Sequence, residues 1–204
     1  MLTKNGPIPG NFVVVAIFLT LLIIHSCTAR PHLVIHQSDT LSVVLRELPG
    51  GYPSINPFHH PYTIPPEAVV DILESLTYEA DAVLPLSKTH PRRVFTKPQA
   101  ERLAPELAEA LSLAPPQQVT AFTITETDKP DRQTKGLAFV LNDELHLIIE
   151  ALRRPRYEGE QNTYQQPIST WKLRPTSPQR LYAHRPDGKG AMTNWIITPL
   201  RKGS

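Results

Sequence analysis

A histidine pair in an aromatic, proline-rich loop is the first place where this sequence could do chemistry. His59 and His60 are adjacent, and Phe58 and Tyr62 flank them within residues 49–66. Imidazole nitrogens bind zinc and exchange protons near neutral pH. Neighbouring side chains of an extended chain point in opposite directions, so the pair alone is a poor chelate. Further ligands would have to come from distant histidines: His90, His146 or His184. We expect instead that the loop packs beside a helix, with no metal site.

Three acids at helical spacing are the second candidate, namely Glu67, Asp71 and Glu74. Paired carboxylates act as general acid and base in glycoside hydrolysis, but acids on a solvated helix face are far commoner. The sequence has no nucleophile elbow, Walker loop, dinucleotide-binding glycine turn or zinc-protease motif. Gly188-Lys189-Gly190 is too short to imply a phosphate cradle. We therefore expect no catalytic residue and no cofactor.

An apolar stretch near the N-terminus indicates where the protein goes. Val13–Ile24 is interrupted only by Thr20 and is followed by Ser26 and Cys27. The run has 12 residues, whereas a helix needs about 20 to cross a bilayer. A polar start, a short apolar core and a small residue before the cleavage point are typical of a secretory signal peptide. We interpret residues 1–26 as a signal peptide.

The junction at residues 24–27, IHSC, resembles the lipobox of bacterial lipoproteins, which Ile24, Ser26 and Cys27 match. The resemblance implies that cleavage leaves Cys27 as the first residue, with lipid on its sulfur and its amino group. Thr28 after the cysteine implies sorting to an outer membrane, facing the periplasm, where the organism has one. Each buried methylene contributes about 0.8 kcal/mol, so two or three chains make a lasting anchor. The alternative is an ordinary signal peptide cut beyond Cys27, which would leave a secreted protein.

Composition describes an exported domain held together by its core alone. Cys27 is the only cysteine, so a chain lipidated there has no thiol for a disulfide, a zinc site or a nucleophile. Residues 27–204 are enough for one ordinary domain. The 22 prolines and 9 glycines favour stiff connectors between short elements over flexible linkers.

Charge is distributed unevenly along the chain. Residues 27–149 hold 10 Lys and Arg against 15 Asp and Glu, whereas residues 150–204 hold 10 against 4. Arg153, Arg154 and Arg156 are thus candidate contacts to an anion or an acidic partner. The interpretation that we favour is that the basic segment covers the domain's own acidic helices. Nucleic acid is not an expected partner of an exported protein.

Hydrophobic periodicity predicts two clear helices in the first half of the chain. Residues 66–76 place apolar side chains on one face, behind Pro65 and Pro66. Residues 96–99 have the form of a capping box that opens a second helix, which ends at 114 and which Pro105 should kink or split. Residues 38–48 also show helical spacing, with a strand as the alternative.

The second half reads as strands. Residues 119–127 alternate between apolar and polar, and residues 137–141 and 144–152 flank Asn142-Asp143, a natural two-residue hairpin turn. Residues 169–173 and 194–198 are the only later strand candidates, and each contains a tryptophan, Trp171 or Trp195.

This order of elements predicts an α+β fold, with two or three helices packed on a small, mainly antiparallel sheet and a proline-rich C-terminal segment. The expected organisation is a signal peptide at 1–26, a tether at 27–37, the domain at 38–153, and a basic extension at 154–204 that packs one or two strands on it. Five side chains are expected in one buried cluster: Leu73, Leu107, Phe122, Phe139 and Leu147.

Two functions from different classes are consistent with the sequence. The first is a lipid-anchored cell-envelope protein, a non-catalytic accessory or assembly subunit that binds a protein partner and attaches to the membrane through Cys27. The alternative is a small lipid-anchored hydrolase or metal-dependent enzyme that uses His59 or His60. The lack of catalytic motifs and the scarcity of glycine favour the first.

Overall fold

The computed structural model describes residues 32–55, 57–80, 90–156, 171–185 and 190–200. Residues 1–26 and Cys27 lie outside these ranges, so the expected signal peptide and lipidation site do too. No helix in the described ranges is long and apolar enough to cross a membrane.

The described residues contain ten strands and two helices. The first half contains β1 (Leu33–Gln37), β2 (Leu41–Glu47), α2 (Pro66–Ser75), β3 (Thr77–Ala80), β4 (Arg92–Arg93) and α3 (Lys97–Leu113). The second half contains β5 (Gln118–Thr125), β6 (Arg132–Leu141), β7 (Glu144–Pro155), β8 (Trp171–Arg174), β9 (Arg180–Ala183) and β10 (Ala191–Pro199).

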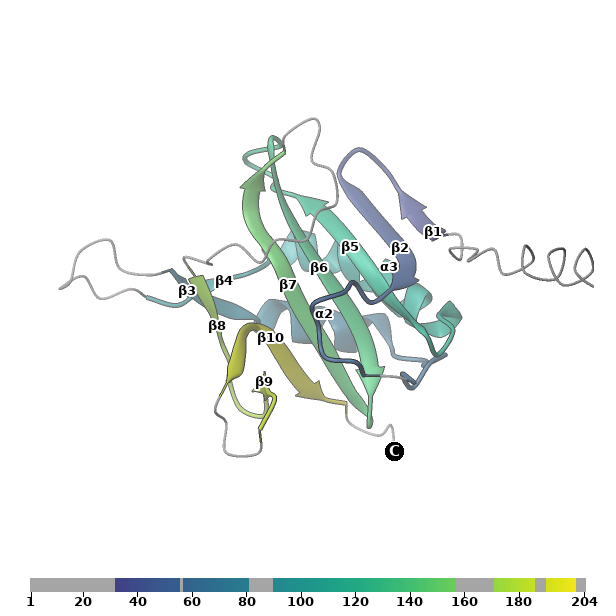
Figure 1. Cartoon of the computed structure of the whole chain (residues 1–204). Coiled ribbons are helices and arrows are strands. Elements are labelled where there is room, and N and C mark those ends of the chain that lie inside the picture. The colour runs from purple at the N-terminus through teal and green to yellow at the C-terminus, as the bar shows by residue number, and fades with distance from the viewer. Residues whose placement is uncertain (1–31, 56, 81–89, 157–170, 186–189, 201–204) are drawn as a thin grey trace, which may run out of the picture. The chain divides into compact units, whose positions relative to one another are not determined.

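The strands form two sheets, shown in Figure 1. A seven-stranded sheet has the order β1-β2-β5-β6-β7-β10-β9, and a three-stranded sheet has the order β4-β3-β8. All neighbouring strands are antiparallel. The segment after residue 153 supplies β8, β9 and β10, and β10 lies between β7 and β9 in the large sheet.

The predicted α+β class with a small sheet is wrong. Strands account for 46% and helices for 19% of the described residues, so the protein is mainly β. The sheet is larger than expected because residues assigned to a helix and to a tether are strands. Residues 41–47 are a strand because Leu41, Val43 and Leu45 are buried where this segment pairs with β5, and residues 33–37 in turn pair with β2.

Residues 38–48 are the clearest case. They were predicted to be helical, but residues 41–47 form β2, which pairs with β5 along its whole length, from Leu41 opposite Ile124 to Glu47 opposite Gln118. Leu41, Val43 and Leu45 alternate on the buried face. A short segment with adjacent valines has little intrinsic helix stability, so pairing with a neighbouring strand determines its conformation. Part of the expected tether, residues 33–37, adds β1 at the sheet edge.

The two clearest helix predictions are confirmed. Pro66 occupies the first turn of α2, and the capping box of α3 forms, with Thr96 and Gln99 bonding to each other's backbone. Pro105 does not split α3, which runs over 17 residues. Pro105 and Glu101 are both on the exposed side, where water can satisfy the carbonyl that the proline leaves free.

Asn142-Asp143 is the predicted hairpin turn between β6 and β7. Both residues have positive φ, 52° and 56°, as a type I′ turn requires.

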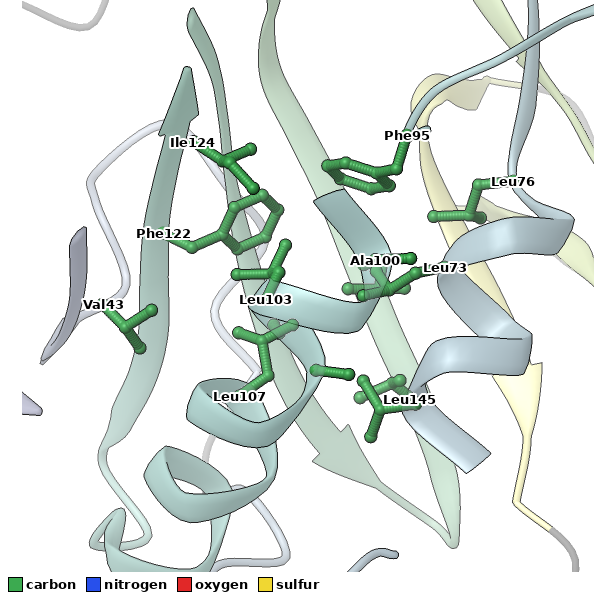
Figure 2. Packing of buried hydrophobic residues seen from close by; sticks show 14 of the residues in the cluster. Val43, Leu73, Leu76, Phe95, Ala100, Leu103, Leu107, Phe122, Ile124 and Leu145 are labelled. Atoms are coloured by element: carbon green, nitrogen blue, oxygen red, sulfur yellow. The ribbon is translucent and has the colours of Figure 1, made fainter. Parts of the chain in front are cut away.

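The two faces of the large sheet carry separate cores. α2 and α3 cover one face, and Figure 2 shows Leu73 from α2, Leu107 from α3 and Phe122 from β5 in that cluster. Leu147 belongs to it as well, but Phe139 does not. Phe139 lies on the opposite face, so the expectation of one cluster is wrong for that residue.

The proline-rich loop after β2 covers the opposite face of the sheet (Figure 1). Phe58 is 2% exposed and packs on Phe139 with ring centroids 4.6 Å apart. Trp195 stacks on Tyr182 at 3.9 Å and meets Tyr52 edge-on at 6.1 Å. The aromatic residues of the loop are therefore core side chains, and burial on both faces explains the near-continuous apolar strands.

Candidate functional site

The histidine pair ties the loop to the sheet. His60 is buried, its Nδ1 lies 3.0 Å from the Gln118 carbonyl oxygen, and its Nε2 accepts from the Val140 amide at 3.0 Å. His59 Nδ1 accepts from the Asn142 amide at 3.2 Å. Burial lowers the pKa of His60 to about 4. Three of the ring nitrogens are thus engaged with backbone groups.

No group of three metal-ligating side chains occurs within the described residues. The acids of α2 do not form a catalytic pair either. Glu74 pairs with Arg93 at 3.8 Å, while Glu67 and Asp71 are exposed. No carboxylate of α2 is placed beside a second one in a buried pocket, which general acid–base catalysis by a carboxylate pair would use.

Arg153 makes structural contacts. Its Nε lies 3.6 Å from Glu126 Oε2, its Nη2 donates to the Arg93 carbonyl at 3.2 Å, and its guanidinium lies 5.8 Å from the centre of the Tyr78 ring. Arg154 and Arg156 are exposed. The three arginines predicted as one contact therefore differ in environment.

Other basic residues of the C-terminal segment pair with acids from earlier in the chain. Arg180 forms a two-pronged bond with Glu144, at 2.6 and 2.7 Å, and Arg174 lies 2.6 Å from Glu79. These bonds hold the pKa of both carboxyls below their usual value. Glu79 and Glu144 lie on strands, whereas the sequence predicts that the basic segment covers acidic helices.

A partly buried ion pair lies on the loop-covered face. Arg46 Nη2 donates to Glu150 Oε2 at 3.2 Å, across the strands that separate β2 from β7. Burial raises the pKa of Glu150, and the charges of Arg46 and Lys135 oppose that rise. Because the two charges compensate one another, this pair contributes to the packing of the face, although Arg46 Nε is buried without a hydrogen-bond partner.

A groove is the feature best suited to binding. We call it the α2–β10 groove, and its volume is about 660 Å³. Its walls are residues 62–65, one side of α2, the loop 176–179, and residues 198–200 at the end of β10. Volumes of roughly 300–1,000 Å³ are usual for ligand sites.

The walls are held in place by side-chain hydrogen bonds between α2 and the loop. Gln179 Nε2 donates to Ser75 Oγ at 2.8 Å, and Ser75 Oγ donates to the Ile72 carbonyl at 2.6 Å. Gln179 Oε1 in turn accepts from the Thr176 amide at 3.3 Å. The loop is thereby fixed against the C-terminal turn of α2, so the groove is largely preformed.

Thr198 is the distinctive polar residue of the groove. It is 6% exposed, and its Oγ1 has no hydrogen-bond partner. It follows Ile197, which faces the loop side, so alternation places it on the helix side with Ile196. A buried hydroxyl without a partner costs about 1–3 kcal/mol.

Within the described ranges, Asp71 is the one charged residue that lines the groove. The structure pairs no basic side chain with it among the described residues, and the remaining walls are apolar or carry neutral hydroxyl and amide groups. Among the residues that the structure describes, no histidine, cysteine or lysine lines the groove. This set of groups can bind an apolar ligand and orient it, but it has no base beside a nucleophile.

Few features of the sequence point to this site. From the sequence, Asp71 is one of three acids on a helix, and Thr198 is one residue of a strand candidate. The groove forms from residues 62–75, 176–179 and 198–200, and the first of these segments lies far from the other two in the sequence. Only the packing of the folded chain brings the three segments together.

Comparison with known proteins does not assign the chain to a family. No protein-family model, no curated protein and no solved structure matches this chain.

Proposed function

We propose that this chain is a lipid-anchored protein of the bacterial cell envelope, attached to the membrane through Cys27, and that its β-sheet domain binds a protein partner without catalysing a reaction. It works as an accessory or assembly subunit. Where the organism has an outer membrane, the anchor lies there and the domain faces the periplasm.

The α2–β10 groove is the observation that supports partner binding. Its walls are fixed by hydrogen bonds and are mostly apolar, and among the described residues they carry one carboxylate, that of Asp71. Apolar walls with a few fixed polar groups are typical of recognition sites. The lipobox-like residues Ile24, Ser26 and Cys27 support the anchor. Four residues, 28–31, separate Cys27 from His32, so the domain would be held close to the lipid surface.

One experiment tests both parts in cells that export the protein. A photo-crosslinking amino acid replaces Ile72, which lines the groove, and the cells receive a fatty-acid analogue. We expect a discrete adduct with one partner and labelling of the protein. Cys27→Ser should abolish the labelling, because the lipid has no sulfur to join, and it should reduce the adduct by moving the domain away from the membrane.

The matched control carries the photo-crosslinking amino acid in place of Asp39. Asp39 is exposed in the turn between β1 and β2, at the opposite edge of the large sheet from β10. Equal adducts from both positions would refute binding at the groove. Equal labelling of the Cys27→Ser protein would refute the lipid anchor.

A further inference from the structure

The groove also indicates what kind of partner segment it takes, an inference that rests on the proposed function. We infer that the α2–β10 groove binds a short aliphatic segment of the partner that carries one basic side chain, with a backbone group of the segment bonded to Thr198 and the basic group at Asp71. A free amphipathic amine and a second copy of this chain are the competing occupants.

The buried hydroxyl of Thr198 supports the backbone contact. Its Oγ1 has no partner among the described residues although the residue is 6% exposed. A hydroxyl both donates and accepts, so it can pair with an amide N–H or a carbonyl. Polar groups of a bound segment would satisfy it, whereas a purely apolar ligand would leave it unpaired.

Thr120 shows why the cavity matters to this argument. Its Oγ1 is also buried without a partner, and it lies opposite Leu45 on the helix side of the same sheet. It does not line the groove, and β6 and β7 separate its strand from β10. An unpaired hydroxyl alone is therefore no binding site, and Thr120 provides the matched control for Thr198.

Charge supports the basic side chain. Asp71 is exposed at the groove and is the one charged side chain among the described residues of its walls. Glu67, one helical turn earlier, adds a second negative charge on the exposed side of α2. An anionic group at this rim would be repelled, and a cation would be attracted.

The separation of the polar groups favours a peptide over a simple amine. Thr198 is buried at the end of β10, whereas Asp71 is exposed on α2, and the apolar side chains of Ile64 and Ile72 belong to the same walls. A ligand that fills the groove therefore needs two polar features with apolar surface between them. A peptide has both, because its backbone amides and its side-chain cation are separate groups.

The test adds defined probes to the full chain and measures their binding from the shifts of its backbone amide NMR signals. The probe is the acetylated and amidated pentapeptide Leu-Ile-Lys-Ile-Leu, with analogues in which norleucine or glutamate replaces the lysine. Octylammonium is the free-amine probe. We expect the lysine peptide to bind most tightly and to shift the amide signals of Ser75, Gln179 and Thr198.

Two substitutions then separate the two contacts. Asp71→Asn should weaken binding of the lysine peptide roughly 1.5- to 5-fold at low salt and leave the norleucine peptide unchanged. Thr198→Val, which keeps the side-chain shape, should weaken every peptide roughly 2- to 12-fold. Thr120→Val should leave all affinities unchanged. Since both threonine variants remove an unpaired hydroxyl, neither should lower the thermal midpoint.

Several results would overturn the inference. Equal affinities for the lysine and norleucine peptides would refute the contact between the cation and Asp71. Equal effects of Thr198→Val and Thr120→Val on affinity would refute the contact with the Thr198 hydroxyl. Octylammonium binding as tightly as the peptide assigns the groove to free amines. Shifts that grow with protein concentration alone assign it to a second copy of the chain.

Failure here is distinct from failure of the proposed function. If the peptides do not bind but the adduct from position 72 persists, the groove binds a partner of other chemistry. If the adduct is also lost, partner binding at the groove is wrong. The Cys27 labelling result stands independently of both.

Discussion

Two buried histidines act as neutral bases in the folded protein. His60 bridges two backbone groups, and His146 accepts from Trp195 Nε1 at 3.2 Å while stacking on Phe139 at 4.9 Å. Burial lowers the pKa of each from 6.5 to about 4. At the residue scale, the sequence offers metal ligation only as a disfavoured alternative for such groups, and in the structure their ring nitrogens bond to buried backbone and indole groups.

We expect acid to destabilise the protein through these two residues. The unfolded chain takes up their protons near pH 6.5 and the folded chain only near pH 4. Between these values the unfolded state binds more protons, so the free energy of unfolding falls as the pH drops through that window. The loss should be on the order of 2–3 kcal/mol for each histidine. Above about pH 6.5 the full stability should be present.

Urea unfolding between pH 4 and 7 measures this dependence. His60→Gln and His146→Gln should each reduce the slope, and the double variant should reduce it most. A double variant with the wild-type slope would show that other groups govern the acid response.

At the scale of elements, one glycine allows a side chain of β5 to pack closely against β6. Gly136 lies opposite Phe122, whose ring covers it. A Cβ at position 136 would lie 2.5 Å from Phe122 Cζ and 2.5 Å from the Ile148 carbonyl oxygen. Since one of those atoms is backbone, the strand itself would have to move.

Gly136→Ala should therefore destabilise the protein by roughly 1–3 kcal/mol, as overpacking does. Gly50 is the matched control, because a Cβ there meets nothing within 4 Å. Gly50→Ala should be neutral or stabilise by about 0.4–1 kcal/mol, since it restricts the unfolded chain. Denaturant midpoints measure both variants. Equal destabilisation by the two would contradict the packing argument.

At the scale of the whole molecule, Arg153 links the two sheets. It lies on β7 of the large sheet with φ of 50°, and it contacts Tyr78 of β3 and Arg93 of β4 in the small sheet. The ion pair with Glu126 holds the same guanidinium. Arg154 and Arg156 are exposed beside it.

Arg153→Glu should lower the free energy of unfolding by about 1–3 kcal/mol, because it breaks these contacts and places two carboxylates together. The double reversal of Arg154 and Arg156 to Glu should change it by less than about 0.5 kcal/mol. Both are read from thermal or denaturant unfolding. A double reversal that leaves the fold stable but prevents adduct formation at position 72 would instead make these arginines part of the partner site.

The sequence by itself determined the elements whose signals are local. α2, α3 with its capping box, and the Asn142-Asp143 hairpin lie where predicted, because each depends on side chains within a few residues of one another. Cys27 remains a prediction of the sequence alone.

Only the tertiary structure decided which segments pair and what they cover. Residues 41–47 are a strand because they pair with β5, and residues 33–37 are a strand because they pair with β2. The loop with Phe58 is a core segment because it covers the second face of the large sheet. The groove has the same origin. Asp71 and Thr198 line the same groove because segments distant in the sequence pack together. No local pattern of residues predicts that packing.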